Sequence, residues 1–280
     1  MGKARVGMSI YSYGADIRRR RMTVEQAIEH AAGLEVEGIE LVDKQHLPNY
    51  MHPRVYDLQR LRDHIESFGM TMSCHSTYID TRPRPDRLAT VEELIHEAHS
   101  QIAEAAVLGA KVYRPAIFGA WSRSPEESEP YYQMVTRIIK EVLPDLKRHN
   151  IKWGSEIHAP MSPDFLLPII RRVNDKSVGL VPDFSAWSIR QVQQTHVVGK
   201  FAPETLKHVL PYTVHIHAKA HSFNEKGEEM NTPYDKLIPI IRESGFDGYI
   251  SAEFEGWWDG TDFDSRNIAE THVKLIRRYL

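Results

Sequence analysis

The sequence is short of cysteine and of long apolar runs. Cys74 is the only cysteine among 280 residues, so no internal disulfide can form, which fits a reducing compartment. No apolar run approaches the roughly 20 residues of a membrane helix. The first residues, Met1 to Val6, lead into strand-like sequence without the apolar core of a signal peptide. We therefore expect a cytoplasmic protein that does not bind membranes.

An excess of charge is also missing, because the formal net charge is only −3. That balance excludes a general nucleic-acid binder, which would carry a basic stripe. One basic run, Arg18 to Arg21, is interpreted as a solvated loop, with an acidic partner or a neighbouring subunit as the alternative. The turn at 12–16 lacks the glycine-rich phosphate-binding fingerprint that usually follows the first strand of an open doubly wound sheet.

What the chain does contain is a regular alternation of strand and helix patterns. Eight such units follow one another without a linker, which predicts an α/β fold: a (β/α)8 TIM barrel forming a single domain over residues 1–280. The expected strands are 6–11, 38–43, 70–78, 111–118, 152–158, 178–184, 213–218 and 248–254. The expected helices are 23–34, 57–68, 91–108, 129–149, 163–173, 203–210, 233–244 and 264–280.

Four of these strands end in a residue that can hold a metal: Glu156, Asp183, His217 and Glu253. Active sites of such barrels lie at the carboxyl ends of the strands, so we expect the four side chains to meet. Three carboxylates and one imidazole suit one divalent ion, with Mn²⁺ preferred and Mg²⁺, Co²⁺ or Zn²⁺ as alternatives. Glu255 faces the same way as Glu253 and could replace it.

Further side chains near these strand ends are candidates for catalysis or substrate binding. His158 shares a face with Glu156, and it could act as a general acid or base or merely orient that glutamate. Lys219 shares a face with His217, and it could act in catalysis by holding a substrate oxygen or form a structural ion pair. The candidates for substrate contact, each with a structural alternative in the core, wall or rim of the barrel, are His75, Arg114, Trp257 and Trp258.

Several motifs resemble the xylose isomerase-like barrels, which include sugar isomerases and epimerases. The resemblance covers essentially the whole chain and implies that Glu156, Asp183, His217 and Glu253 bind one divalent metal. In the ketose epimerases of that family the two matching glutamates also move the proton. The motifs are Gly38-Ile-Glu-Leu-Val, Cys74-His-Ser-Thr-Tyr, Val181-Pro-Asp, His215-Ile-His-Ala-Lys and Ala252-Glu-Phe-Glu-Gly.

The sequence departs from the ketose epimerase pattern at three positions. Ala186, Ser162 and Phe223 stand where a histidine, an acid and an arginine are usual. The Asp-x-His pair of the related zinc endonucleases is also missing. A histidine shortly after the glutamate, as His158 follows Glu156, instead resembles the catalytic subunit of enzymes that cleave C-glycosides.

These features predict a metal-dependent enzyme that abstracts a proton next to a carbonyl of a carbohydrate or keto-sugar. Isomerisation or epimerisation is the first expectation, and a lyase cleaving 3-keto C- or O-glycosides by β-elimination is the alternative. A non-catalytic sugar-binding or scaffold barrel is the alternative from another class. We expect a small carbohydrate as the partner, no nucleic acid, and a homo-oligomer, or a hetero-oligomer with a second subunit if the protein is a lyase.

Overall fold

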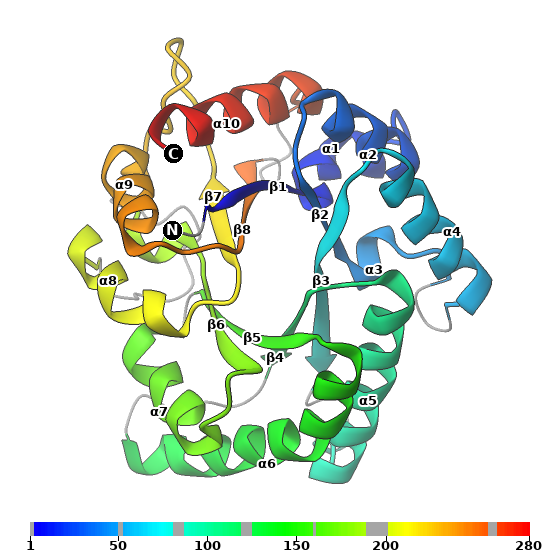
Figure 1. The fold of residues 1–280 in the computed structure, drawn as a ribbon, viewed down its shortest axis with the longest axis vertical. Helices are drawn as coiled ribbons and strands as arrows, with labels where there is room; N and C mark the ends of the chain where they lie inside the picture. The colour runs from blue at the N-terminus through cyan, green and yellow to red at the C-terminus, as the bar shows by residue number, and fades with distance from the viewer. Residues whose placement is uncertain are drawn as a thin grey trace.

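The computed structural model describes residues 3–49, 53–80, 87–118, 125–158, 161–188, 201–256 and 262–280. In this part of the chain eight parallel strands form an inner ring, and the helices surround it (Figure 1). The prediction of a (β/α)8 barrel is confirmed. No helix among the described residues is long and apolar enough to span a membrane.

The strands follow one another around the barrel. Strands β1 to β6 pair one after another, β7 pairs with β8, and β8 pairs with β1. Only β6 and β7 lack a continuous ladder; two single bridges, Leu180–Thr213 and Asp183–His217, join them. The strands are β1 (Arg5–Ser9), β2 (Gly38–Val42), β3 (Thr71–Asp80), β4 (Val112–Phe118), β5 (Lys152–Ile157), β6 (Val178–Pro182), β7 (Ile216–Ala220) and β8 (Tyr249–Phe254).

The larger helices start and stop where local chemistry favours it. Thr23 and Thr90 each form a capping box at a helix start, and Gly109 ends a helix in the left-handed conformation. These helices are α2 (Val24–Gly33), α4 (Val55–Ser67), α5 (Val91–Leu108), α6 (Pro125–His149), α7 (Pro163–Val173), α9 (Tyr234–Ser244) and α10 (Ser265–Tyr279).

The structure corrects the predicted elements in two places. The helix predicted at 203–210 is a chain of short turns, namely η3 (Pro203–Thr205), α8 (Leu206–Val209) and η4 (Leu210–Tyr212). Strand β7, predicted from 213, starts at Ile216. Four further short helices were not predicted: η1 (Ile10–Tyr13), α1 (Gly14–Arg18), α3 (Asp43–His46) and η2 (Phe184–Trp187).

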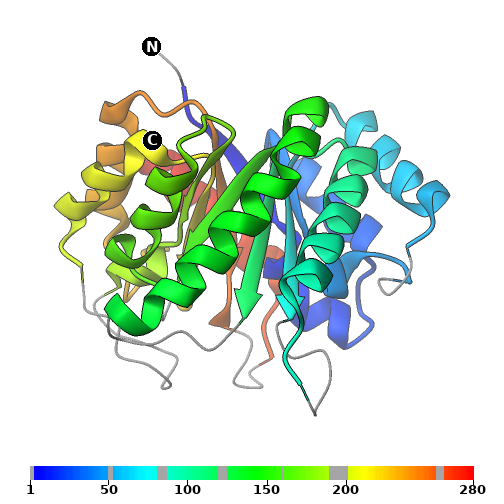
Figure 2. The same cartoon turned by 90° about the horizontal axis from the view of Figure 1, so that it is seen from below.

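Glycine is required where β6 passes η4. A Cβ atom on Gly179 would lie 2.3 Å from the carbonyl oxygen of Tyr212, so only glycine lets the two backbones approach this closely. This contact lies beside the Leu180–Thr213 bridge, at the start of β6. In Figure 2 the strand arrows point to the lower end of the barrel, away from the C-terminus of the chain. The carboxyl ends of the strands therefore lie at that lower end.

Candidate metal centre at the carboxyl end of the barrel

The structure brings the four predicted ligands together. Nδ1 of His217, in β7, lies 2.6 Å from Oε1 of Glu156 in β5 and 3.2 Å from Oε2 of Glu253 in β8. Asp183 follows β6 directly and bridges to His217 along the backbone. Glu156, Asp183 and His217 offer ligand atoms that all lie within 4.8 Å of one another.

Asp183 carries an unsatisfied oxygen. Its Oδ1 accepts a hydrogen bond of 2.7 Å from the backbone N–H of Ser185, which caps η2. Its Oδ2 is buried and has no hydrogen-bond partner among the described residues, and the ammonium of Lys219 lies 3.4 Å away. The ammonium offsets the charge of this oxygen but gives it no hydrogen bond, so the oxygen is still open to a metal ion.

The charges around these residues are strongly coupled. Burial raises the pKa of Glu156, but Arg114 and His217 outweigh burial and hold that pKa well below its ordinary value. Burial lowers the pKa of His217, but Glu40 and Glu253 outweigh burial and raise it well above its ordinary value. In the absence of an ion, a proton on Nδ1 of His217 therefore lies between two carboxylates.

That position suits a divalent cation. The donor set of three carboxylates and one imidazole is one that such ions prefer, and a cation would offset the repulsion among the acids. A cation there would replace the Nδ1 proton of His217 and could reach Oδ2 of Asp183. The residues present therefore fit a divalent metal ion.

Lys219 forms ion pairs with Glu253 in β8 and with Glu255 directly after that strand. Its Nζ lies 2.5 Å from Oε1 of Glu253 and 2.8 Å from Oε2 of Glu255. Glu255 also accepts a hydrogen bond of 3.0 Å from the hydroxyl of Tyr11. Glu253 reaches His217 with its second oxygen, while Glu255 is held on both oxygens, which favours Glu253 as the ligand.

Two other predicted residues lie beside the ligands. His158 is half-buried at the end of β5; burial lowers its pKa, but Asp183 and Glu156 outweigh burial and raise it. Arg114, in β4, is almost fully buried with Nη1 3.5 Å from Oε2 of Glu156. Arg114 is therefore placed to hold Glu156 ionised.

His75 is not brought to this cluster. Strand β3 continues to Asp80, so His75 is not at its end, and its Nε2 lies 3.7 Å from Oε2 of Glu104 on α5. Thr77, two residues on, also faces α5 through a bond to Gln101. The predicted substrate contact of His75 is therefore corrected, because its side chain points to the helices. Trp257 and Trp258 lie outside the described residues.

A second group of possible ligands lies deeper in the barrel: Glu40, Cys74, His215 and His217 are all buried and within 4.8 Å of one another. A register shift after Ile39 sets Cys74 opposite Glu40, so both face inward. Burial and the charge of Glu40 raise the pKa of Cys74 to about 11, which disfavours the thiolate that binds metals. Sequence reasoning missed Glu40 and His215, although both lie inside quoted motifs.

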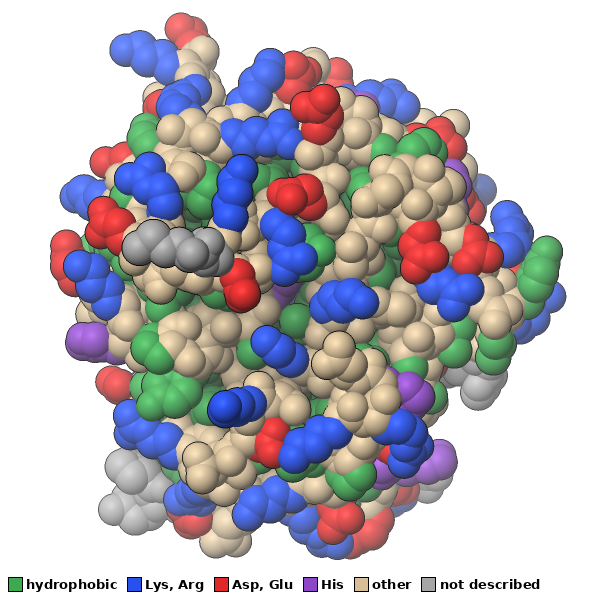
Figure 3. Space-filling view, in the orientation of Figure 1, with side chains coloured by type: hydrophobic (Ala, Val, Ile, Leu, Met, Phe, Trp, Pro, Cys, Tyr) green, Lys and Arg blue, Asp and Glu red, His purple; other side chains and the backbone are tan. Residues whose placement is uncertain are grey.

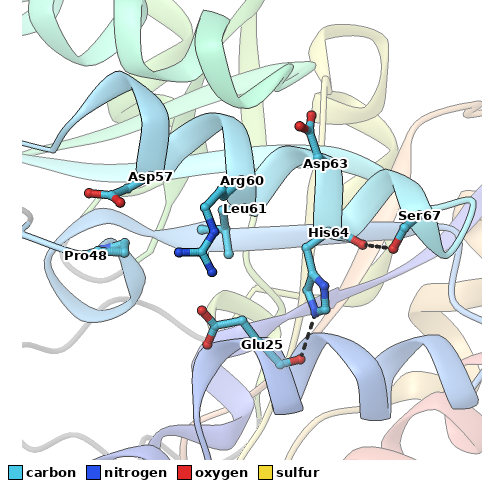
Figure 4. Close-up of a pocket in the computed structure, with 8 residues that line it drawn as sticks. All are labelled: Glu25, Pro48, Asp57, Arg60, Leu61, Asp63, His64 and Ser67. Carbon is cyan, nitrogen blue, oxygen red and sulfur yellow. Dashed lines mark hydrogen bonds between the residues drawn. The ribbon is translucent and has the colours of Figure 1, made fainter.

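The outer surface offers a different hollow, of about 290 Å³, between α2 and α4 (Figure 4). It contains none of the four ligands and has acidic and basic groups side by side. The face seen in Figure 3 likewise intersperses charges of both signs. The residues that line the hollow are Glu25, Pro48, Asp57, Arg60, Leu61, Asp63, His64 and Ser67.

The basic run from Arg18 to Arg21 forms ion pairs within the chain. Arg19 and Arg21 each lie 2.7 Å from Asp262.

The family model of the xylose isomerase-like TIM barrels matches residues 28–279, nearly the whole chain. This chain belongs to that family. Two curated relatives are the 3'-dehydrocarminate deglycosidase alpha subunit of a Microbacterium species and a C-glycoside deglycosidase alpha subunit of Arthrobacter globiformis. Each is 22% identical over 98% of this chain, and the matches cover 94% and 91% of those proteins.

Solved structures agree with this family at the level of the fold. D-psicose 3-epimerase from Clostridium cellulolyticum superimposes with a TM-score of 0.74 at 11% identity, covering 99% of both chains. The IOLI protein, solved with a zinc atom bound, gives a TM-score of 0.72 at 15% identity and the same coverage. The predicted resemblance to sugar isomerases and to deglycosidase subunits is therefore confirmed as a family relationship.

Proposed function

We propose that this xylose isomerase-like barrel is a divalent-metal-dependent enzyme that abstracts a proton next to a carbonyl of a carbohydrate or keto-sugar. The observation that carries the proposal is the convergence of Glu156, Asp183 and His217, whose ligand atoms lie within 4.8 Å of one another, with Glu253 3.2 Å from His217. Mn²⁺ is the preferred ion, because the set is rich in carboxylate oxygen and lacks thiolate.

The residues of the chain divide the work by position. When bound, the metal would polarise the substrate carbonyl and stabilise the negative charge that develops on its oxygen. Glu156, Glu253 and His158 are the groups placed to take or return the proton. The ammonium of Lys219 is buried beside Asp183 and Glu253, where it is placed to hold a substrate oxygen.

A lyase reaction is the second candidate, supported by the deglycosidase relatives and by His158 beside Glu156. Its first step would be the same proton abstraction. The electron pair of the broken C–H bond would then form a C=C bond and expel the substituent on the neighbouring carbon, which leaves with the bonding electrons and takes up a proton. Since those relatives are named alpha subunits, we propose a second subunit for this case and a homo-oligomer otherwise.

A substrate panel separates these candidates. Purified protein is incubated in deuterated buffer containing Mn²⁺ with free keto-sugars or with 3-keto C- and O-glycosides. An epimerase returns a sugar with deuterium on the carbon next to the carbonyl, whereas a lyase releases the aglycone. A chelator should stop either reaction, and the Glu156→Gln variant should be inactive. Turnover that persists in chelator would refute the metal dependence.

A non-catalytic sugar-binding or scaffold barrel predicts a different outcome. Such a barrel need hold no stoichiometric metal, so elemental analysis of the purified protein distinguishes it from an enzyme. About one ion per chain, lost on substitution of Asp183, would support the proposed centre. Absence of any metal after incubation with Mn²⁺, Zn²⁺ and Co²⁺ would favour the scaffold.

A further inference from the structure

His217 has a second ring nitrogen that faces the barrel interior. Its Nε2 lies 3.0 Å from Oε1 of Glu40, and both side chains are fully buried. In this structure Nε2 makes no aligned hydrogen bond, although the carboxylate is within reach. Among the described residues, Glu40 is the carboxylate paired with this nitrogen, while Glu156 and Glu253 both approach Nδ1.

The proposed metal centre puts a requirement on that nitrogen. A neutral imidazole that binds a metal through Nδ1 must carry its remaining proton on Nε2. A buried N–H of this kind needs an acceptor, and a carboxylate behind a metal-binding histidine fixes both its tautomer and its ring orientation. Glu40 lies where such an acceptor is required.

Glu40 is itself held firmly. The hydroxyl of Ser76 donates to Oε1 over 2.5 Å, and Nε2 of His215 lies 3.2 Å from Oε2. Ser76 in turn accepts a hydrogen bond of 3.1 Å from Nε of Arg114, whose Nη1 lies 3.5 Å from Glu156. Glu40 is therefore linked to two of the proposed ligands: directly to His217 and, through Ser76 and Arg114, to Glu156.

We propose, building on the proposed metal centre, that Glu40 is a positioning residue that fixes His217 as the Nε2–H tautomer and aims Nδ1 at the ion. The inner group of Glu40, Cys74 and His215 is then a support for the centre and not a metal site. Both oxygens of Glu40 are already engaged, and Nε2 of His215 also lies 2.9 Å from Oγ of Ser251. An ion placed there would also lie away from Asp183, which is not a member of the inner group.

The test measures metal binding by calorimetry on the purified full chain with Mn²⁺. Glu40→Gln should weaken affinity about 10- to 100-fold, the usual effect of removing a group that orients a metal-bound histidine. Glu104→Gln is the matched control, because it makes the same change beside the outward-facing His75, and it should bind Mn²⁺ like the wild type. Cys74→Ser should also bind Mn²⁺ normally.

A spectroscopic readout separates positioning from a general loss of stability. With ¹⁵N-labelled histidine and diamagnetic Zn²⁺, NMR should show one histidine protonated at Nε2 and metal-bound at Nδ1 in the wild type. That signature should be lost or mixed in Glu40→Gln. If this variant does not fold, Ser76→Ala, which removes the hydroxyl that holds Oε1, should still weaken Mn²⁺ binding several-fold, and unchanged affinity would overturn the role of Glu40.

The outcomes distinguish the two proposals. A wild-type protein that binds no metal refutes the proposed function itself. If the wild type binds Mn²⁺ and Glu40→Gln binds it with the same affinity, only the role of Glu40 is refuted. Loss of binding in Cys74→Ser, or a thiolate-to-metal charge-transfer band with Co²⁺, would place the ion in the inner group and overturn the inference.

Discussion

Replacing Asp183 by asparagine separates metal binding from folding. Asp183 is fully buried, and its Oδ1 accepts the backbone N–H of Ser185 at the start of η2. Asparagine keeps a carbonyl oxygen for that cap and has nearly the same volume. The change removes the negative charge and puts an amide in place of the unsatisfied Oδ2, so Asp183→Asn should fold but bind the ion poorly.

The size of the effect follows from linkage. An ion at a free concentration 100 times its Kd stabilises the folded state by about 2.7 kcal/mol. Unfolding entropy near 2.1 cal/mol/K per residue gives about 0.6 kcal/mol/K for a chain of this length. Mn²⁺ should therefore raise the wild-type Tm by about 4–5 °C relative to chelator, and the rise should fall below about 1 °C in Asp183→Asn.

The assay is thermal unfolding of both proteins in chelator and in Mn²⁺. Asp175→Asn is the matched control, because Asp175 also accepts a backbone N–H two residues on, from Ser177, but lies before β6. That control should keep the full rise of the wild type. A full metal-dependent rise in Asp183→Asn would show that Asp183 is not a ligand and would refute the reasoning.

Three further predictions concern catalysis and pH. Glu156→Gln should weaken Mn²⁺ binding and abolish turnover, and an active, metal-free variant would contradict its role as a ligand. His158→Ala should lose about 10²- to 10⁴-fold in kcat while keeping its metal, the usual contribution of a general base; simultaneous loss of the metal would indicate that His158 only orients Glu156. Burial lowers the pKa of His272 to about 3 in the folded chain. As pH falls below about 6.5, this histidine is protonated in the unfolded chain but stays neutral in the folded chain, so stability is lost. Between pH 7 and 5 this costs about 2 kcal/mol of stability, and urea unfolding of His272→Gln should show a smaller acid loss than the wild type; an identical loss would exclude His272 as the cause.

The barrel could be predicted because its signals are local. Apolar strand runs alternate with helical periodicity, and Thr23 and Thr90 mark two helix starts with capping boxes that the structure contains. Short elements such as η1 and α3 escaped prediction, since four residues give no measurable periodicity. The turns from Pro203 to Tyr212 look like one helix in sequence, but Pro211, which lacks a backbone N–H, lies within the last of them.

The four proposed ligands could be found because each lies in or directly after an apolar stretch of sequence that predicts a strand, although His217 is the second residue of β7 and not at its end. Glu40, inside β2, and His215, directly before β7, could not, because a single polar residue in an apolar stretch carries no signal of its partners. Only closure of the sheet brings β2 across from β7, and no spacing in the sequence encodes that contact. His75 was placed wrongly because β3 runs five residues past it and alternation turns its side chain outward.

The position of the ion is tested most directly by diffraction from crystals grown with Mn²⁺, using its anomalous signal. We predict one strong peak about 2.0–2.4 Å from side-chain atoms of Glu156, Asp183, His217 and Glu253, the range found for divalent ions with oxygen and nitrogen ligands. A peak beside Cys74 and His215, or no peak in crystals that contain Mn²⁺ well above its measured Kd, would contradict the proposed centre.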